Sequence, residues 1–78
     1  MDSNLALLTQ IASEILCRYD LDLTPSTRIL SVKGWDSVAL VKMILLLESQ
    51  LGVEFDTYDV ANIKEVGHIL AMMEKAQA

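Results

Sequence analysis

The sequence has a single cysteine, Cys17, so it can form neither an internal disulfide nor a metal site built from several cysteines. Cysteine this scarce is typical of chains that work in a reducing compartment, and we expect a cytoplasmic protein. Only three glycines and one proline interrupt a sequence that is 53% hydrophobic, which favours compact helices over disorder. At 78 residues, we expect a single domain over residues 1–78 with a modest core.

Positive charge is also scarce. Six lysines and arginines against eleven acidic residues give a net charge of −5, and no basic stripe offsets it locally, so nucleic acid is not expected as a partner. The longest apolar stretch, Val38 to Leu47, is broken by Lys42 and is about half the length of a membrane-spanning helix. No basic segment precedes an apolar one at the N-terminus. We therefore expect neither a signal peptide nor membrane insertion.

Motifs for catalysis and metal binding are missing as well. The only histidine is His68, and no Gly-x-Ser-x-Gly elbow surrounds any serine, which argues against a serine hydrolase. One cysteine, one histidine and scattered acids show no metal-ligand spacing, and the three glycines are too dispersed to form a phosphate loop. The sequence predicts a protein that is not an enzyme and holds no metal.

Apolar residues at helical spacing predict helices at both ends of the chain. The first runs from about Ser3 to Tyr19, and the last from about Lys64 to Lys75, where Gly67 suggests close packing against a neighbour. A short helix is expected over Asp56 to Asn62. The apolar faces of the two long helices are formed by Leu5, Leu8, Ala12, Ile15, Leu16 and Tyr19, and by Val66, Ile69, Leu70 and Met73.

Residues 20–35 lack periodicity and contain the turn formers Pro25 and Gly34, so they predict a long connection. Such connections are often functional or are held down by their own side chains. Here three apolar residues are available to insert between the helices: Leu23, Ile29 and Leu30. A purely structural crossing is an equally good interpretation.

A helix from Asp36 or Ser37 to Leu51 is the centre of the predicted fold. Asp36 suits the N-cap, and Gly52 suits the left-handed residue that ends a helix. On a helical wheel the predicted core face holds Leu40, Val41, Ile44, Leu47 and Leu51. The opposite face holds Val38, Ala39, Lys42, Leu45, Leu46 and Ser49. Such an apolar outer face indicates contact with a partner or burial under the long connection.

Ser37 lies in the first turn of this predicted helix, where its hydroxyl can face solvent. A phosphate attached there is stabilised by the free N–H groups and the helix dipole. Helix capping alone also explains an Asp-Ser pair at this position.

Three segments together resemble the acyl carrier protein family over nearly the whole chain: Gly34-x-Asp36-Ser37-Val38, the run from Leu47 to Phe55, and Val66-Gly67-His68-Ile69-Leu70. The resemblance implies an all-α four-helix bundle, with three longer helices, one short helix and a long first loop. This agrees with the periodicity read from the residues themselves.

The resemblance implies that Ser37 carries covalent 4′-phosphopantetheine, which a phosphopantetheinyl transferase takes from coenzyme A. Asp36 matches the acidic motif residue, which caps the helix and helps a magnesium ion approach the serine. The cofactor thiol would hold acyl or aminoacyl groups as thioesters for loading and processing enzymes. Docking contacts of the family match Val38 and Leu45, and we expect Ala39, Lys42 and Leu46 to belong to the same docking surface.

Departures from the family bear on the pathway. Carriers of primary fatty acid synthesis are strongly acidic along this helix, whereas this chain has Ala39, Lys42, Ser49 and Gln50. We therefore expect a stand-alone, monomeric carrier for a specialised lipid, polyketide or nonribosomal peptide type pathway. The alternatives are primary fatty acid synthesis or a cofactor-free helical interaction module. A cleft lined by Ile44, Leu47, Met72 and Met73 could shelter cargo, but these residues are also suited to a plain core.

Overall fold

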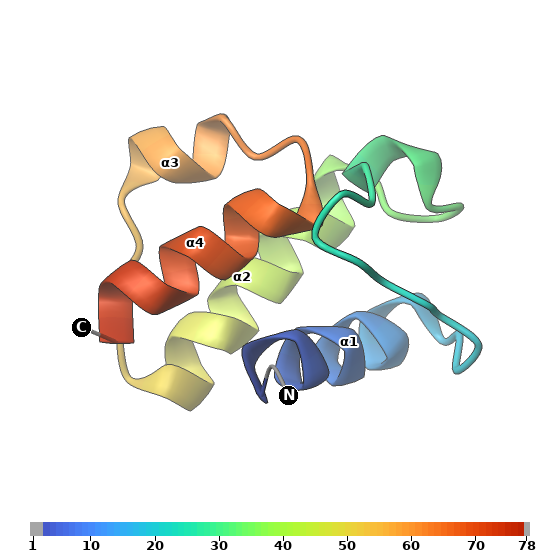
Figure 1. Ribbon diagram of the computed structural model, residues 1–78, viewed down its shortest axis with the longest axis horizontal. Helices are drawn as coiled ribbons and strands as arrows, with labels where there is room; N and C mark the ends of the chain where they lie inside the picture. Colours follow the sequence, from blue (N-terminus) through green and yellow to red (C-terminus); the bar gives the residue numbers. More distant parts are fainter. Residues whose placement is uncertain (1–2, 78) are drawn as a thin grey trace.

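The computed structural model describes residues 3–77 of the chain. Four α-helices and one short 3-10 helix follow one another, and no strand occurs within the described residues (Figure 1). Their bounds are α1, Ser3–Leu16; η1, Ile29–Ser31; α2, Ser37–Leu51; α3, Thr57–Ala61; and α4, Val66–Gln77. The predicted all-α bundle, with a long first connection and one short helix, is confirmed.

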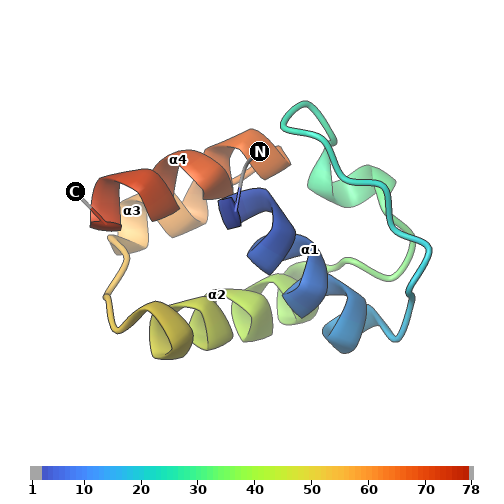
Figure 2. The same ribbon diagram turned by 60° about the horizontal axis from the view of Figure 1, so that its bottom comes forward.

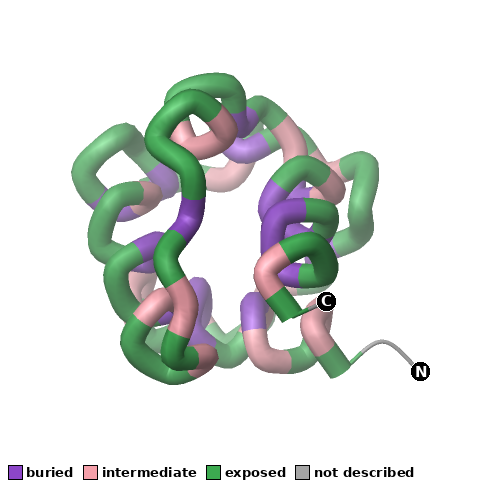
Figure 3. The backbone as a smooth tube through the Cα atoms, turned by 90° about the vertical axis from the view of Figure 1, so that its left-hand side faces the viewer, coloured by how far each residue is buried: buried purple, intermediate pink, exposed green. Residues whose placement is uncertain are grey.

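The three longer helices enclose the core. Helix α1 packs against both α2 and α4 (Figures 1 and 2), and the buried stretches of these helices face the interior (Figure 3). The predicted apolar face of α4 is wholly buried, and α1 contributes Ile11 in addition to the predicted Leu8 and Ala12. The side chains most fully enclosed are Leu8, Ile11, Met43, Leu47, Val66, Ile69 and Met73.

Local signals at the helix ends act as predicted. Gly52 ends α2 in the left-handed conformation at φ 66°, and the N–H of Val53 then bonds to Glu48 O at 3.1 Å. The Asp56 side chain caps α3 by accepting the N–H of Tyr58 at 2.7 Å. Asp36 caps the start of α2 in the same way.

The end of α1 differs from the prediction. The helix stops at Leu16, and Cys17 takes the left-handed conformation at φ 53° while the N–H of Arg18 bonds to Ser13 O. This is the backbone arrangement found at the end of α2, with cysteine where α2 has glycine. Tyr19 therefore lies beyond the helix and is 81% exposed, not on its buried face. Cys17 is exposed.

The connection between α1 and α2 runs past the start of α4 (Figure 1) and is joined to it through the backbone. The N–H of Ile29 bonds to Lys64 O at 3.0 Å, that of Val66 to Thr27 O at 2.8 Å, and that of Gly67 to Pro25 O at 2.7 Å. Leu23 and Ile29 insert into the core as predicted, but Leu30 is 85% exposed. A 3-10 turn places neighbouring residues on different sides, so Ile29 and Leu30 cannot both point inward.

At its first residues the connection is also tied to its later part. The Arg18 guanidinium donates to Asp20 at 3.4 Å and, at 3.5 Å, to the carbonyl of Lys33. The hydrogen bond from Arg18, with its positive charge, lowers the pKa of the Asp20 carboxyl.

The close packing predicted at Gly67 is with the connection. A Cβ at this position would lie 2.8 Å from Pro25 O, the atom that accepts the Gly67 N–H. Alanine would normally stabilise a helix by about 1 kcal/mol relative to glycine. Here we expect Gly67→Ala to lower the free energy of unfolding by roughly 1–3 kcal/mol, because the backbone of the connection must move away.

Urea denaturation followed by circular dichroism measures this loss. The control is Ala71→Gly, at an exposed position of the same helix, which reports helix propensity without a steric contact. A Gly67→Ala protein more stable than wild type would show that the connection does not press on α4.

Candidate functional site

Asp36 and Ser37 form the start of α2. Asp36 has extended backbone geometry, and its Oδ1 accepts the N–H of Ala39 at 2.9 Å, as an N-cap residue does. Ser37 is the first residue of the helix, and its side chain is exposed. The predicted cap is confirmed, and the serine is placed where the helix offers its free N–H groups and the positive end of its dipole.

The residues just before the serine hold this helix start in place. Gly34 makes the turn at φ 90°, a conformation that favours glycine. Trp35 follows, only 2% exposed, and its backbone N–H bonds to Val32 O at 3.1 Å. Its indole Nε1 is buried and has no hydrogen-bond partner within residues 3–77. The buried indole thus anchors the chain directly beside the exposed Asp36 and Ser37.

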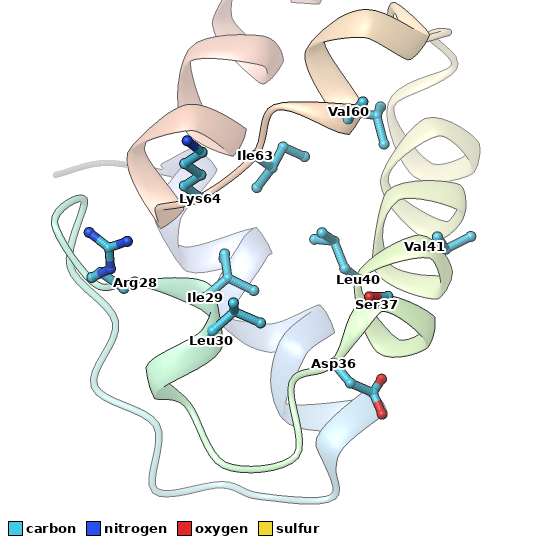
Figure 4. Close-up of a pocket in the computed structure, with 11 residues that line it drawn as sticks. Arg28, Ile29, Leu30, Asp36, Ser37, Leu40, Val41, Val60, Ile63 and Lys64 are labelled. Atoms are coloured by element: carbon cyan, nitrogen blue, oxygen red, sulfur yellow. The ribbon is translucent and has the colours of Figure 1, made fainter.

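A cavity of about 510 Å³ lies beside Ser37. Figure 4 shows α2 on one side of it, with the side chain of Leu40 directed across it, and the η1 segment with Ile29 and Leu30 on the other. Ile63 and Val60 close it from the α3 side. The cavity is lined by Arg28, Ile29, Leu30, Asp36, Ser37, Leu40, Val41, Val60, Ala61, Ile63 and Lys64.

This set differs from the residues that the sequence suggested for a cleft. Ile44, Leu47, Met72 and Met73 are all buried in the core, and none of them lines the cavity beside Ser37. The connection supplies much of the wall instead. Its contribution depends on backbone bonds between distant segments, and no periodic pattern in the sequence marks them.

The outer face of α2 is exposed, with one correction. Val38, Leu45 and Leu46 are 63%, 59% and 39% exposed, and Lys42 is exposed too. Ala39 was placed on this face by the wheel but is buried, at 8%. Val41 was placed in the core but is 51% exposed. The other predicted placements hold for Ile44 and Leu47 in the core and for Val38, Lys42, Leu45, Leu46 and Ser49 outside it. Ala39 and Val41 were misplaced because the nearly continuous apolar run of α2 does not mark where the core face ends.

His68 is not assembled with Ser37. Its Nδ1 accepts the backbone N–H groups of Lys64 and Glu65, at 3.0 and 3.2 Å, just ahead of α4. It does not line the cavity that contains the serine. His68 therefore binds free backbone donors near a helix start, which is a structural role.

Neither a metal site nor a membrane helix emerges from the described part of the chain. Within residues 3–77, no three His, Cys, Asp or Glu side chains gather closely enough to hold a metal ion. Over the same residues, every helix is too short or too polar to span a bilayer.

The capping role of Asp36 can be tested by substitution. We expect Asp36→Ala to reduce the free energy of unfolding by about 0.5–2 kcal/mol, because the bond to the Ala39 N–H is lost. Asp36→Asn keeps an oxygen acceptor at the N-cap and should have nearly wild-type stability. Chemical denaturation of both variants measures the difference. Equal destabilisation by alanine and asparagine would contradict the capping role.

A group attached at Ser37 would find a suitable environment. The hydroxyl is accessible, a phosphate on it would lie at a helix N-terminus, and an adjoining apolar cavity could receive a flexible substituent. No general base or orienting group accompanies the serine among the residues lining the cavity, apart from the capping carboxylate of Asp36.

Comparison with known proteins identifies the family of this chain. Residues 6–73 match the family model described as a phosphopantetheine attachment site. The chain is 34% identical over 65 residues to the acyl carrier protein of Thermotoga maritima, covering 83% of this chain and 80% of that protein.

Solved structures agree as well. The holo acyl carrier protein of Geobacter metallireducens has a TM-score of 0.85 at 25% identity, over 94% of this chain and 84% of its own. A candidate acyl carrier protein from Mycobacterium tuberculosis shares the fold, with a TM-score of 0.81 at 24% identity over 90% of this chain and 93% of that one. This chain belongs to the acyl carrier protein family, whose members are not enzymes but carry acyl groups on covalently bound 4′-phosphopantetheine.

Proposed function

We propose that Ser37 is the attachment residue for 4′-phosphopantetheine. The supporting observation is that Ser37 is the exposed first residue of α2, beside the cap Asp36 and at the edge of the cavity. Ser37 Oγ forms the phosphodiester bond to the pantetheine 4′-phosphate of coenzyme A, loses its proton, and adenosine 3′,5′-bisphosphate leaves. When bound, the group supplies a terminal thiol that holds acyl or aminoacyl groups as thioesters.

The residues of the chain itself then have defined tasks. Asp36 fixes the start of α2, so that Ser37 is presented at the same place to every enzyme. Asp36 directly precedes Ser37, and its carboxylate would help a magnesium ion bound by the transferase to approach the serine. The N–H groups of the first turn favour the negative charge of the phosphodiester.

We further assign partner docking to an outer face of α2 defined by Val38, Lys42, Leu45 and Leu46. All four side chains are exposed. The only acid between residues 37 and 51 is Glu48, and its Oε2 is engaged by the N–H of Phe55 at 2.7 Å. The face therefore offers apolar contact with one positive charge, and basic partner surfaces would gain little from electrostatic steering.

This charge pattern supports a carrier for a specialised lipid, polyketide or nonribosomal peptide type pathway. Primary fatty acid synthesis is the second candidate, since carriers of both classes belong to the acyl carrier protein family. Loading assays with enzymes of each class separate the two. Efficient loading with malonyl groups by a primary fatty acid synthesis transacylase would favour the second candidate.

The attachment itself is tested by intact-protein mass spectrometry. The purified protein is incubated with coenzyme A, magnesium and a phosphopantetheinyl transferase of broad specificity, and the product is fragmented to locate the modification. We expect the mass of one phosphopantetheine, located on Ser37. Addition at another residue, or none with several transferases, would overturn the assignment.

A further inference from the structure

The cavity beside Ser37 is apolar along most of its wall but ends in two cations. Arg28 comes from the connection and Lys64 from the segment that precedes α4. Figure 4 shows both on the wall opposite α2, with their charged ends on the side away from Ser37. The aliphatic lining between the two ends includes Ile29, Leu40 and Ile63.

Within the described part of the chain, neither of these two cations is held in an ion pair, in contrast to two of the other four lysines and arginines. Arg18 pairs with Asp20, and Lys75 lies 3.7 Å from Asp59. Arg28 and Lys64 have no acidic side chain within ion-pair distance among residues 3–77. Two of the six lysines and arginines thus line one cavity in a chain of net charge −5.

Two acids lie close to these cations in sequence or line the same cavity. Asp36 lines the cavity at the serine side, and its Oδ1 is bonded to the Ala39 N–H. Glu65 follows Lys64, but its Oε1 lies 3.9 Å from His68 Nε2, and it does not line the cavity. The side of the cavity away from Ser37 is thus lined by two cations and by no acidic side chain of the described residues.

The backbone holds the cationic end in position. The pairing of Arg28 with Glu65 is an isolated antiparallel bridge, and the N–H of Ile29 bonds to Lys64 O. Arg28 and Lys64 are thus neighbours on two joined segments. Two cations kept near one another bind an anionic group better than either does alone.

We infer that this carrier is adapted to acyl groups with a negatively charged far end, such as dicarboxylic half-thioesters, whose chain lies in the cavity and whose free carboxylate is bound by Arg28 and Lys64. The inference rests on the proposed attachment at Ser37. The inference depends on charge complementarity. An apolar lining alone would accommodate any acyl chain and would not require two cations at one side of the cavity.

The test compares two loaded forms of the whole protein. A six-carbon hexanoyl group and a six-carbon adipoyl group, which ends in a carboxylate, are attached through amide analogues of the thioester that do not hydrolyse. Intact mass confirms loading before any melting. We expect the melting temperature of the adipoyl form to exceed that of the hexanoyl form by roughly 2–5 °C at low salt, the size expected for exposed charge pairs in a domain of this length.

Variants show whether the two cations cause the difference. Arg28→Gln and Lys64→Gln should each reduce it by half or more. Lys33→Gln removes the same charge from an exposed residue outside the cavity, and should leave the difference unchanged. High salt should shrink it in the wild type.

Other results would overturn the inference. Equal melting temperatures for the two forms, or a difference that survives in both variants, would show that the cations do not bind cargo. If Arg28 and Lys64 instead raise the melting temperature of the holo form above that of the apo form, and the adipoyl group adds no further increase, the two cations bind the phosphodiester and not the cargo. Failure of the attachment assignment is seen separately, as a missing mass addition in the wild type.

Discussion

Ser37→Ala is expected to abolish attachment of phosphopantetheine while leaving the fold intact. The hydroxyl oxygen is the only atom of the Ser37 side chain that can form the phosphodiester. We therefore expect attachment to be lost completely and not merely slowed. Ser37 is exposed and makes no contribution to the buried core, so alanine should change stability by less than about 0.5 kcal/mol. Intact mass and far-ultraviolet circular dichroism measure the two effects.

Ser49→Ala is the matched control for this change. Ser49 is also exposed and lies on the same helix, but at its other end. The control protein should gain the full mass of one phosphopantetheine. Residual modification of the Ser37→Ala protein would mean that a different hydroxyl accepts the group.

Leu45→Asp is expected to slow loading by partner enzymes about 30-fold, with little change in stability. Leu45 is 59% exposed in the middle of the docking face, so its apolar surface is available to a partner and not to the core. Central apolar contacts of an interface commonly contribute about 2 kcal/mol, which corresponds to this factor. The measured quantity is kcat/KM for the carrier in transferase and acyl-loading assays. Val38→Asp should act in the same direction.

The control separates lost apolar contact from added charge. Ser49→Asp introduces the same negative charge one turn further along the same face, at a position that is already polar. It should alter kcat/KM by no more than a few fold. If Ser49→Asp slows loading as much as Leu45→Asp, charge repulsion and not apolar contact governs recognition. Unchanged rates for Val38→Asp and Leu45→Asp would place docking elsewhere.

Three helix boundaries of this chain follow from single residues. Asp36, Gly52 and Asp56 each satisfy backbone groups at a helix end within a few residues of themselves, so the sequence is sufficient to locate them. The end of α1 was missed because Cys17 has no side-chain property that favours the left-handed conformation it adopts. When a helix ends at a left-handed residue other than glycine, the sequence does not indicate where that end lies.

The site was only half predictable. Ser37 and Asp36 are adjacent in sequence, and their relation to α2 is local. The opposite wall of the cavity is distant in sequence, since Arg28 and Lys64 are brought together by hydrogen bonds between main-chain atoms. Ala39 was predicted to be exposed and Val41 to be buried, and the structure shows the reverse. A helix that is apolar on most sides gives a similar helical-wheel pattern when it is rotated, so the wheel did not distinguish the two.

The bonds between the connection and α4 have a consequence for how such carriers diverge. Three N–H groups, those of Ile29, Val66 and Gly67, hold the segment in place, and all three acceptors are carbonyl oxygens. Apart from the glycine, these bonds constrain no side chain. Residues 28 and 64 can therefore be replaced during evolution without breaking the backbone bonds that hold this wall of the cavity in place. Selection can change the chemical character of the cavity independently of the fold, the attachment residue and the surface read by partner enzymes.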